Sequence, residues 1–380
     1  MAARADFLVI GAGMAGASAG YELAAAGRVI VLEQEDRPGV HATGRSAALF
    51  SETYGNATVR ALSRASRPFL AAPPGGFCES ALLGPRGALF IAAEADRPLL
   101  EAEAAEGGDA FESLSGDEVR ALVPILKPEA SAAGLLEPGA MDIDVDALHQ
   151  GYLRGLRQRG GEVIAQAGVA DLRRERGVWT AQTPAGSFEA PIVVNAAGAW
   201  ADEVAGRAGL GAMGLAAKRR TAALIDAPDH DVRAWPLVIE VGERFYFKPD
   251  AGRLLISPAD ETDAKPGDAQ PDDLDVAIAA DRIEKATTLV IRRIAHRWAG
   301  LRTFAPDRTP VCGFDPRSEG FFWLAGQGGY GIQTAPALAR LTASLATGSP
   351  LPAGIGTETA AAVSPARYAS AAQGSSTLGQ

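Results

Sequence analysis

The chain has 380 residues, 47% of them hydrophobic and 22% charged, with a formal net charge of -10. This length exceeds what one small core needs and fits two domains of ordinary globular composition. The negative balance argues against a nucleic-acid-binding surface, which needs clustered Lys and Arg to contact phosphates. We therefore expect a small-molecule substrate and no nucleic-acid partner.

The sequence contains no run of about 18 uncharged apolar residues, the length needed to span a bilayer. The apolar segment 7–21 is interrupted by glycines and lacks a signal-peptide cleavage site. We therefore expect no transmembrane segment and a cytoplasmic location. The two cysteines, Cys78 and Cys312, form neither a disulfide framework nor a metal site with ligand spacing. We expect both to be buried apolar thiols, and no bound metal.

Residues 6–10 predict a buried parallel strand that runs directly into the glycine-rich turn 11–16, GAGMAG, and an Ala-rich helix. Gly11 permits the tight turn, Gly13 lets backbone N–H groups approach a pyrophosphate, and Gly16 lets the helix pack closely on the strand. The N-terminus of the helix then faces the anion. This arrangement predicts a dinucleotide-binding turn.

A second strand is expected over residues 29–32, and Glu33 follows it, 20 residues beyond Gly13. An acid at this point accepts hydrogen bonds from the ribose hydroxyls and repels a 2′-phosphate. A glycine pattern alone often marks only a turn, but strand, helix, second strand and acid all occur here in order. FAD and NAD are both compatible with these residues.

Residues 37–48 combine glycine with hydroxyl side chains, whose N–H and O–H groups can line a cofactor. Nicotinamide-binding units do not usually carry this continuation. Farther along, apolar spacing predicts a helix over residues 146–158 and a strand over residues 162–164. Alternation in residues 245–248 and 253–256, separated by a Pro-Asp-Ala-Gly turn, predicts a hairpin.

Several ordered blocks resemble the D-amino acid oxidase superfamily of flavoproteins, and within it the bacterial D-arginine dehydrogenases. The blocks are residues 43–48, 76–79, 142–155, 194–200, 218–220, 248–252, 298–302 and 327–334. The resemblance implies FAD as the cofactor. Some relatives attach flavin to a Cys close to the position of Arg302, but Cys312 lies ten residues farther on, so we expect noncovalent FAD.

The resemblance also implies an α/β fold, in which a Rossmann-like FAD-binding domain with the GxGxxG turn is interleaved with an α+β substrate domain built on a largely antiparallel sheet. We expect the FAD-binding domain to comprise residues 1–50, 140–215 and 300–364. The substrate-binding domain is then formed by residues 51–139 and 216–299. We expect the tail, residues 365–380, to be disordered because it is rich in Ser, Ala and Gly.

The expected cofactor site follows from the dinucleotide turn and from the matched blocks. Near the C-terminus, residues 328–334 are expected to present N–H groups and a helix dipole to the pyrimidine edge of the flavin. The alternative is a simple glycine-rich turn. The expected cofactor-binding residues are Gly11, Gly13, Met14, Ala15, Gly16, Glu33, Gln34, Ala42, Thr43, Gly44, Arg45, Ser46, Ala47, Ala48, Leu49, Val169, Gly198, Gly328, Gly329, Tyr330, Gly331, Ile332 and Gln333.

Four residues match the positions that the superfamily uses to hold the substrate. Arg220 and Arg302 match arginines that bind the substrate carboxylate, for which the planar guanidinium is well suited. Tyr246 matches a phenol that contacts the same carboxylate, and Tyr54 matches one that lines the pocket. The alternatives are structural ion pairs for the arginines, as we expect for Arg219, and half-buried packing for the tyrosines.

The expected wall around the substrate side chain departs from the D-arginine dehydrogenases. Their pattern places a glutamate at the position of Ala88 and a histidine at that of Leu49. An unpaired buried guanidinium is costly, so this chain should prefer a neutral or apolar side chain. Glu240 or Glu243 would restore a carboxylate if either pointed inward. The expected wall comprises Leu49, Ser51, Ala88, Leu237 and Ile239.

The resemblance implies hydride transfer from the α-carbon of a D-amino acid to flavin N5, after which the imino acid hydrolyses to a 2-oxo acid and ammonia. The amine must be neutral first, so activity should rise with pH. The electron acceptor is open among oxygen, a quinone and other acceptors. Two alternatives remain: an oxidase of glycine, sarcosine or a cyclic imino acid that makes hydrogen peroxide, and a noncatalytic FAD-binding electron-transfer or assembly subunit.

Overall fold

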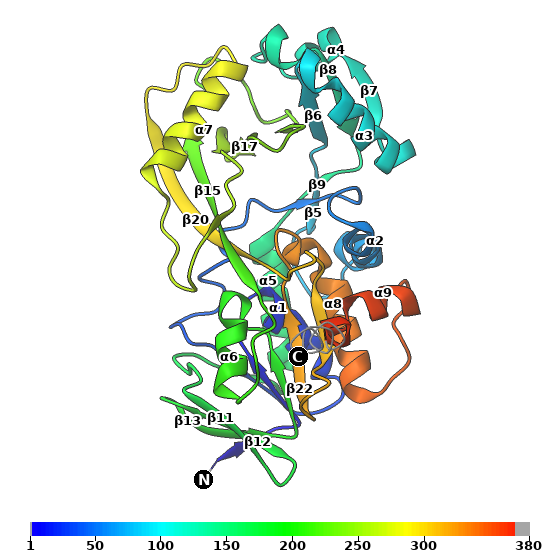
Figure 1. The fold of residues 1–380 in the computed structure, drawn as a ribbon, viewed down its shortest axis with the longest axis vertical. Helices are drawn as coiled ribbons and strands as arrows, with labels where there is room; N and C mark the ends of the chain where they lie inside the picture. Colours follow the sequence, from blue (N-terminus) through cyan, green and yellow to red (C-terminus); the bar gives the residue numbers. More distant parts are fainter. Residues whose placement is uncertain (1, 369–380) are drawn as a thin grey trace, which may run out of the picture.

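The computed structural model describes residues 2–368, and Figure 1 shows them as two lobes along the long axis of the molecule. One lobe contains α1, α5, α8 and β22, and the other contains α3, α4, α7 and β6. Two long paired strands, β15 (Ala216–Ile225) and β20 (Ile294–Phe304), extend from one lobe toward the other.

The first lobe is built on a six-stranded sheet in the order β10-β3-β2-β14-β22-β21. The first five strands are parallel and β21 is antiparallel to β22. Strands β2 and β3 are buried along their whole length because both faces of the sheet are covered. The strands are β10 (Glu162–Ile164), β3 (Val29–Leu32), β2 (Phe7–Ile10), β14 (Ile192–Asn195), β22 (Phe321–Ala325) and β21 (Val311–Phe314).

Helices cover one face of this sheet and a small second sheet covers the other. On the helical face, Val9 and Val31 pack with Leu338 and Leu341 of α8, and on the opposite face Leu8 packs in a cluster that contains Trp179 and Phe188. The helices of this lobe are α1 (Met14–Leu23), α2 (Ala57–Ala71), α5 (Val145–Gln158), α6 (Ala201–Arg207), α8 (Gly331–Thr347) and α9 (Thr357–Val363). The small sheet contains β1 (Ala3–Arg4), β13 (Gly186–Ala190), β12 (Val178–Thr183) and β11 (Asp171–Glu175).

The second lobe is built on a nine-stranded sheet whose neighbouring strands are antiparallel, except for the parallel pair β16 and β6. Helices α4 (Gly116–Leu122) and α7 (Asp273–Ala286) pack on one face, and α3 (Arg97–Gly107) packs against β6 and β8. Besides β15 and β20, the strands are β19 (Thr262–Asp263), β18 (Arg253–Ser257), β17 (Tyr246–Asp250), β16 (Leu237–Glu240), β6 (Ala88–Ala92), β8 (Ala133–Glu137) and β7 (Glu112–Ser115).

A three-stranded sheet, β4-β9-β5, lies between the lobes (Figure 1). It consists of β4 (Leu49–Phe50), β9 (Met141–Ile143) and β5 (Leu83–Pro85). Short 3-10 helices complete the described elements, and they are η1 (Glu94–Asp96), η2 (Gly108–Ala110), η3 (Pro128–Ala130), η4 (Gly198–Trp200) and η5 (Pro365–Tyr368). Within the described range, no helix is both long and apolar enough to cross a membrane.

The predicted fold class is confirmed: a parallel α/β sheet is interleaved along the chain with a largely antiparallel sheet. The predicted helix over residues 146–158 is α5, the predicted strand over residues 162–164 is β10, and the predicted hairpin is β17 with β18. The division into an FAD-binding and a substrate-binding domain at the stated boundaries stays a prediction.

Two expectations are wrong in part. The tail was expected to be disordered from residue 365, but Pro365 is buried and the Tyr368 hydroxyl donates a hydrogen bond to Asp307 at 2.7 Å, so η5 is anchored to the body. The rest of that expected tail, residues 369–380, lies outside the described range. Cys312 is buried as expected, whereas Cys78 is only half-buried, because it lies in an irregular segment near the surface.

Candidate active site

One cavity extends from the carboxyl ends of the parallel strands to the nine-stranded sheet. It is lined by Ile10, Leu32 and Ala196 at the ends of β2, β3 and β14, and by Tyr246 and Arg302 of the second sheet. Its empty volume is about 1600 Å³, the open mouth included. Crevices at the carboxyl ends of parallel strands are where open α/β sheets bind dinucleotides.

The turn between β2 and α1 requires glycine at two positions. Gly11 has a φ of +98°, and a Cβ on it would lie 2.6 Å from the carbonyl oxygen of Ala196. A Cβ on Gly16 would lie 1.8 Å from the carbonyl oxygen of Gly11, so a side chain there would force the helix away from the strand. These contacts match the roles expected for the two glycines.

The backbone N–H and the backbone carbonyl of Ala12 are both hydrogen-bonded to buried side chains. Its N–H donates to Glu33 Oε2 at 2.8 Å, and its carbonyl accepts from Nε2 of His149, also at 2.8 Å. Burial lowers the pKa of His149, which keeps the imidazole neutral and able to donate. His149 is therefore a buried support for the turn. Glu33 lines the cavity, and its contact with a ribose stays a prediction.

The cavity wall presents polar groups that lack protein partners. Helix α1 starts after Gly13 and helix α8 starts after Tyr330, and neither of these preceding residues caps its helix with a side chain, although the Met14 N–H of α1 donates to Thr43 Oγ1 at 2.9 Å. The first turns of both helices line the cavity. The Nδ1 atom of His41 is buried without a hydrogen-bond partner among the described residues, while its ring packs on Trp200. Uncapped N–H groups suit anionic phosphates, and the orphaned nitrogen suits a further polar atom. The residues present fit FAD.

Most of the expected cofactor residues line this cavity. The exceptions are Gly16, Gly44, Ala48, Leu49, Tyr330 and Gln333. Gln333 is buried and bridges two segments, because its Oε1 accepts from the Ser51 N–H at 3.0 Å and its Nε2 donates to Ser63 Oγ at 2.8 Å. The residues on the wall are Gly11, Gly13, Met14, Ala15, Glu33, Gln34, Ala42, Thr43, Arg45, Ser46, Ala47, Val169, Gly198, Gly328, Gly329, Gly331 and Ile332.

Arg302 lies where the cavity meets the second sheet. Burial opposes its charged form, but the phenols of Tyr54 and Tyr246 and the carboxylate of Glu261 together raise the pKa of the guanidinium. A Cβ on Gly329 would lie 3.0 Å from its Nη1, so the loop before α8 packs directly on the guanidinium. Arg302 forms no ion pair with any described residue. A half-buried cation without a carboxylate partner on a cavity wall is suited to an anionic ligand.

Arg220 also lines the cavity, but it already has partners. Its Nε donates to the carbonyl of Asp260 at 2.8 Å, and its Nη2 lies 3.2 Å from Oε1 of Glu261. Arg308 holds the same carboxylate, with nitrogen–oxygen distances of 3.0 and 2.9 Å. The two arginines flanking Glu261 lower the pKa of its carboxyl despite its burial. Arg220 would therefore share its charge between Glu261 and a bound anion.

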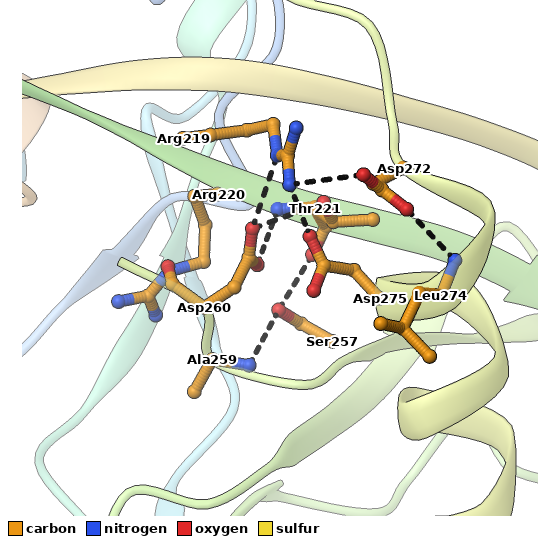
Figure 2. A network of polar contacts seen from close by, with 9 residues as sticks. All are labelled: Arg219, Arg220, Thr221, Ser257, Ala259, Asp260, Asp272, Leu274 and Asp275. Atoms are coloured by element: carbon orange, nitrogen blue, oxygen red, sulfur yellow. Dashed lines mark hydrogen bonds and ion pairs between the residues drawn. The ribbon is translucent and has the colours of Figure 1, made fainter. Parts of the chain in front are cut away.

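Arg219 belongs to a structural network, as expected. Its Nη2 lies 2.7 Å from Asp275 Oδ2 and 3.6 Å from Asp272 Oδ2, and its Nε lies 3.7 Å from Asp260 Oδ2. Asp260 also accepts hydrogen bonds from Thr221. Figure 2 shows Arg219 facing these carboxylates, whereas the guanidinium of Arg220 points away from Asp272 and Asp275. The network fixes the loop around Asp260, whose carbonyl accepts from Arg220, against β15 and α7.

The residues expected to surround the substrate side chain do not line this cavity. Leu49 and Ile239 pack with Ala88 in a separate apolar cluster, and Leu237 pairs with Ala88 across β16 and β6. Their contact with a substrate stays a prediction. Ser51 is buried and hydrogen-bonded to protein groups.

Neither of the two glutamates on the segment before Tyr246 restores a free carboxylate. Glu240 is occupied by Arg244, at 2.5 Å, and by the Gly242 and Arg244 N–H groups. Glu243 is exposed on the turn between β16 and β17.

Sequence reasoning missed several residues at this site. His41 was not assigned a role, and Glu261 was not recognised as the partner of Arg220. Glu137 was also missed, although a glutamate that ends the apolar strand Ala133–Glu137 before a Pro-Gly turn is a signal of a buried carboxylate. Trp200 and Arg207 complete the cofactor end of the wall.

Fold and cavity together define a dinucleotide-dependent enzyme of the flavoprotein type. Residues 6–345 match the DAO family, described as FAD dependent oxidoreductase, so the chain belongs to this family and uses FAD. Over 366 residues it is 26% identical to a glycine oxidase of Bacillus licheniformis, which covers 92% of this chain and 95% of that protein. The solved structure of glycine oxidase from Geobacillus kaustophilus superimposes with a TM-score of 0.79 at 25% identity, covering 93% of this chain and 100% of that one.

A further relative is the uncharacterised oxidoreductase YurR of Bacillus subtilis, which is 28% identical over 253 residues. The alignment covers 65% of this chain and 65% of that protein, so the chain spans just under two thirds of this relative's length. The superfamily expected from the sequence blocks is confirmed. The relatives found are glycine oxidases and other members of this superfamily, so the expected specific similarity to the D-arginine dehydrogenases is not confirmed.

Proposed function

We propose that the protein oxidises a small neutral amino acid at the carbon that bears the amino group, acting on the D isomer where that carbon is chiral. The observation that carries the proposal is Arg302, a half-buried guanidinium without an ion pair among the described residues, which lines the end of the cofactor cavity and interacts with the phenols of Tyr54 and Tyr246. A carboxylate bound to Arg302 would hold the α-carbon beside the space that fits the flavin.

The residues of the chain bind and orient the substrate. Arg302 can pair with both carboxylate oxygens, and Tyr246 and Tyr54 can donate hydrogen bonds from their phenols. When bound, FAD accepts the hydride that the α-carbon loses. The substrate amine must be neutral beforehand, and the resulting imino acid hydrolyses to a 2-oxo acid and ammonia. No protein base is assigned, because a substrate with a neutral amine loses its α-hydrogen as hydride and no proton has to be removed from the α-carbon.

The expected side-chain wall supports a small, uncharged substrate. Leu49, Ala88 and Ile239 offer no charge, and they belong to one apolar cluster in which Ala88 is buried and Leu49 and Ile239 are partly buried. A long cationic side chain would find no charge on these three residues, and the carboxylate opposite Ala88, that of Glu137, is already held by hydrogen bonds from Ser51, Thr53 and the Glu52 N–H. The D configuration rests on the matched sequence blocks, which resemble enzymes of D-amino acids.

A second candidate is oxidation of glycine or sarcosine with oxygen as the acceptor. It is favoured by the two glycine oxidases, which are similar to this chain over nearly its full length. Glycine has no side chain, so a wall without charged groups also suits it. Peroxide formation in air separates an oxidase from a dehydrogenase that needs a quinone or another acceptor.

The test is an anaerobic titration of the purified flavoprotein with D- and L-alanine, D-proline, D-leucine, D-arginine, glycine and sarcosine, following the loss of flavin absorbance. We expect small neutral D-amino acids or glycine to bleach the flavin at the lowest concentrations. If D-arginine were the best reductant, the neutral-substrate proposal would be wrong. If no amino acid bleached the flavin while dithionite did, a noncatalytic flavoprotein would be the better description.

A further inference from the structure

Glu137 is a buried carboxylate without an ion pair among the described residues. It ends β8, directly opposite Ala88 on β6, and its side chain is only 3% exposed. Burial raises the pKa of its carboxyl, and hydrogen bonds from Ser51, Thr53 and the Glu52 N–H oppose that effect. Because three hydrogen-bond donors and no cation hold this carboxylate, its role is to fix the segment to which those donors belong.

All three donors belong to one short turn. Oε2 of Glu137 accepts from Ser51 Oγ at 2.8 Å and from Thr53 Oγ1 at 2.9 Å, and Oε1 accepts from the Glu52 N–H at 3.2 Å. The Ser51 oxygen in turn accepts from the N–H groups of Thr53, at 3.3 Å, and Tyr54, at 3.2 Å. The hydroxyl of Ser51 therefore uses its one proton on Glu137 and both lone pairs on the backbone of the turn.

The turn ends at Tyr54, whose side chain interacts with Arg302. The phenol of Tyr54 lies against the guanidinium of Arg302, and its ring meets Tyr330 edge to face, with centroids 4.9 Å apart. The start of the turn is also tied to α8, because the Ser51 N–H donates to Gln333. We propose that Glu137 is a positioning residue, whose carboxylate holds residues 51–54 in the conformation that places the Tyr54 phenol beside Arg302. This inference rests on the proposed function, in which Arg302 and Tyr54 bind the substrate carboxylate.

The hydrogen-bond pattern explains why glutamine cannot replace Glu137. If the amide oxygen faced Ser51 and Thr53, the NH₂ group would face the Glu52 N–H, donor against donor. In the other orientation the Ser51 hydroxyl would lose its acceptor. Either way a buried donor stays unpaired. Glu137→Gln thus keeps size and shape but disrupts the turn.

The first test is hydrogen–deuterium exchange of the FAD-loaded protein, which needs no turnover. We expect amides of residues 51–54 to exchange about tenfold faster or more in Glu137→Gln and in Ser51→Ala. Glu52→Gln is the matched control, because the Glu52 side chain pairs with Arg67 at 3.0 Å and makes no bond within the turn. Equal exchange in wild type and Glu137→Gln would overturn the proposal. Should Glu137→Gln fail to fold, Thr53→Val removes one donor of the same network at nearly constant shape.

The second test links the turn to the site. We expect Glu137→Gln and Ser51→Ala to raise KM, and the Kd of acetate measured by flavin absorbance, by about tenfold, with kcat changed much less. Each should be non-additive with Tyr54→Phe, since all three changes remove the same contact. A merely structural Glu137 would lower Tm and leave KM and the acetate Kd at their wild-type values, which would refute the proposal. Failure of every amino acid to reduce the wild-type flavin would instead refute the proposed function, and the exchange experiment would still decide the role of Glu137.

Discussion

Replacing Arg302 tests the step on which the assigned chemistry depends. Arg302 is the cavity cation that no described carboxylate neutralises, whereas Arg220 is shared with Glu261. A charge-assisted hydrogen bond contributes about 1.5–3 kcal/mol, and each 1.4 kcal/mol is a factor of ten in affinity. We therefore expect Arg302→Ala to raise KM about 10- to 150-fold, or more if both carboxylate oxygens are bound.

Arg302→Lys separates charge from geometry. Lysine keeps the positive charge but loses the planar fork, so we expect KM to rise by less than in Arg302→Ala and flavin reduction at saturating substrate to slow, because the α-carbon is held less well. The assay is stopped-flow flavin reduction over a range of substrate concentrations. Flavin content, read from the absorbance ratio, should stay normal in both variants. Arg253→Lys, at an exposed pair with Asp226, is the control. Reduction of Arg302→Ala with wild-type KM and rate would show that Arg302 does not bind the substrate.

Three further predictions concern the cofactor, the specificity and the buried thiol. Acid or heat should release intact FAD from the wild type, and Gly13→Leu should abolish flavin retention, since a Cβ on Gly13 would already lie 3.2 Å from Thr43 Oγ1 at the cavity wall; flavin that stays with the precipitated chain would contradict noncovalent binding. Ala88→Glu should improve D-arginine relative to neutral substrates if Ala88 faces the substrate, and an unchanged ratio would show that it does not. Burial raises the pKa of Cys312 from 9.0 to about 12. The thiol therefore makes its full contribution to the free energy of unfolding below pH 9, and this contribution is lost as the pH rises from 9 through 12. Iodoacetamide at pH 8 should therefore leave Cys312 unmodified, as read by peptide mass, until the protein is unfolded.

The cofactor turn was predictable because its strand, its glycines and its helix follow one another directly in the sequence. Strand β2, the glycines at 11 and 16 and the first turn of α1 are contiguous, and the close approach of Gly16 to Gly11 lies within this segment, whereas the Ala196 carbonyl that leaves no room for a side chain at Gly11 comes from the end of β14. The helix α5 and the β17–β18 hairpin were predictable for the same reason, since a periodicity of 3.6 or 2 residues appears within one short segment. The sequence blocks also placed the chain in its superfamily.

The partners of the site residues were decided only by the tertiary structure. Glu137 reaches Ser51 across 86 residues of sequence, and Glu261 reaches Arg220 across 41. Periodicity predicts which face of a strand is buried, but it does not predict which strands become neighbours or which buried polar groups meet. Arg219 and Arg220 show the consequence: adjacent side chains on one strand point to opposite faces, so one enters a structural network and the other lines the cavity. A polar side chain acquires its role from the groups that satisfy its hydrogen bonds, and here those groups come from distant segments of the folded chain.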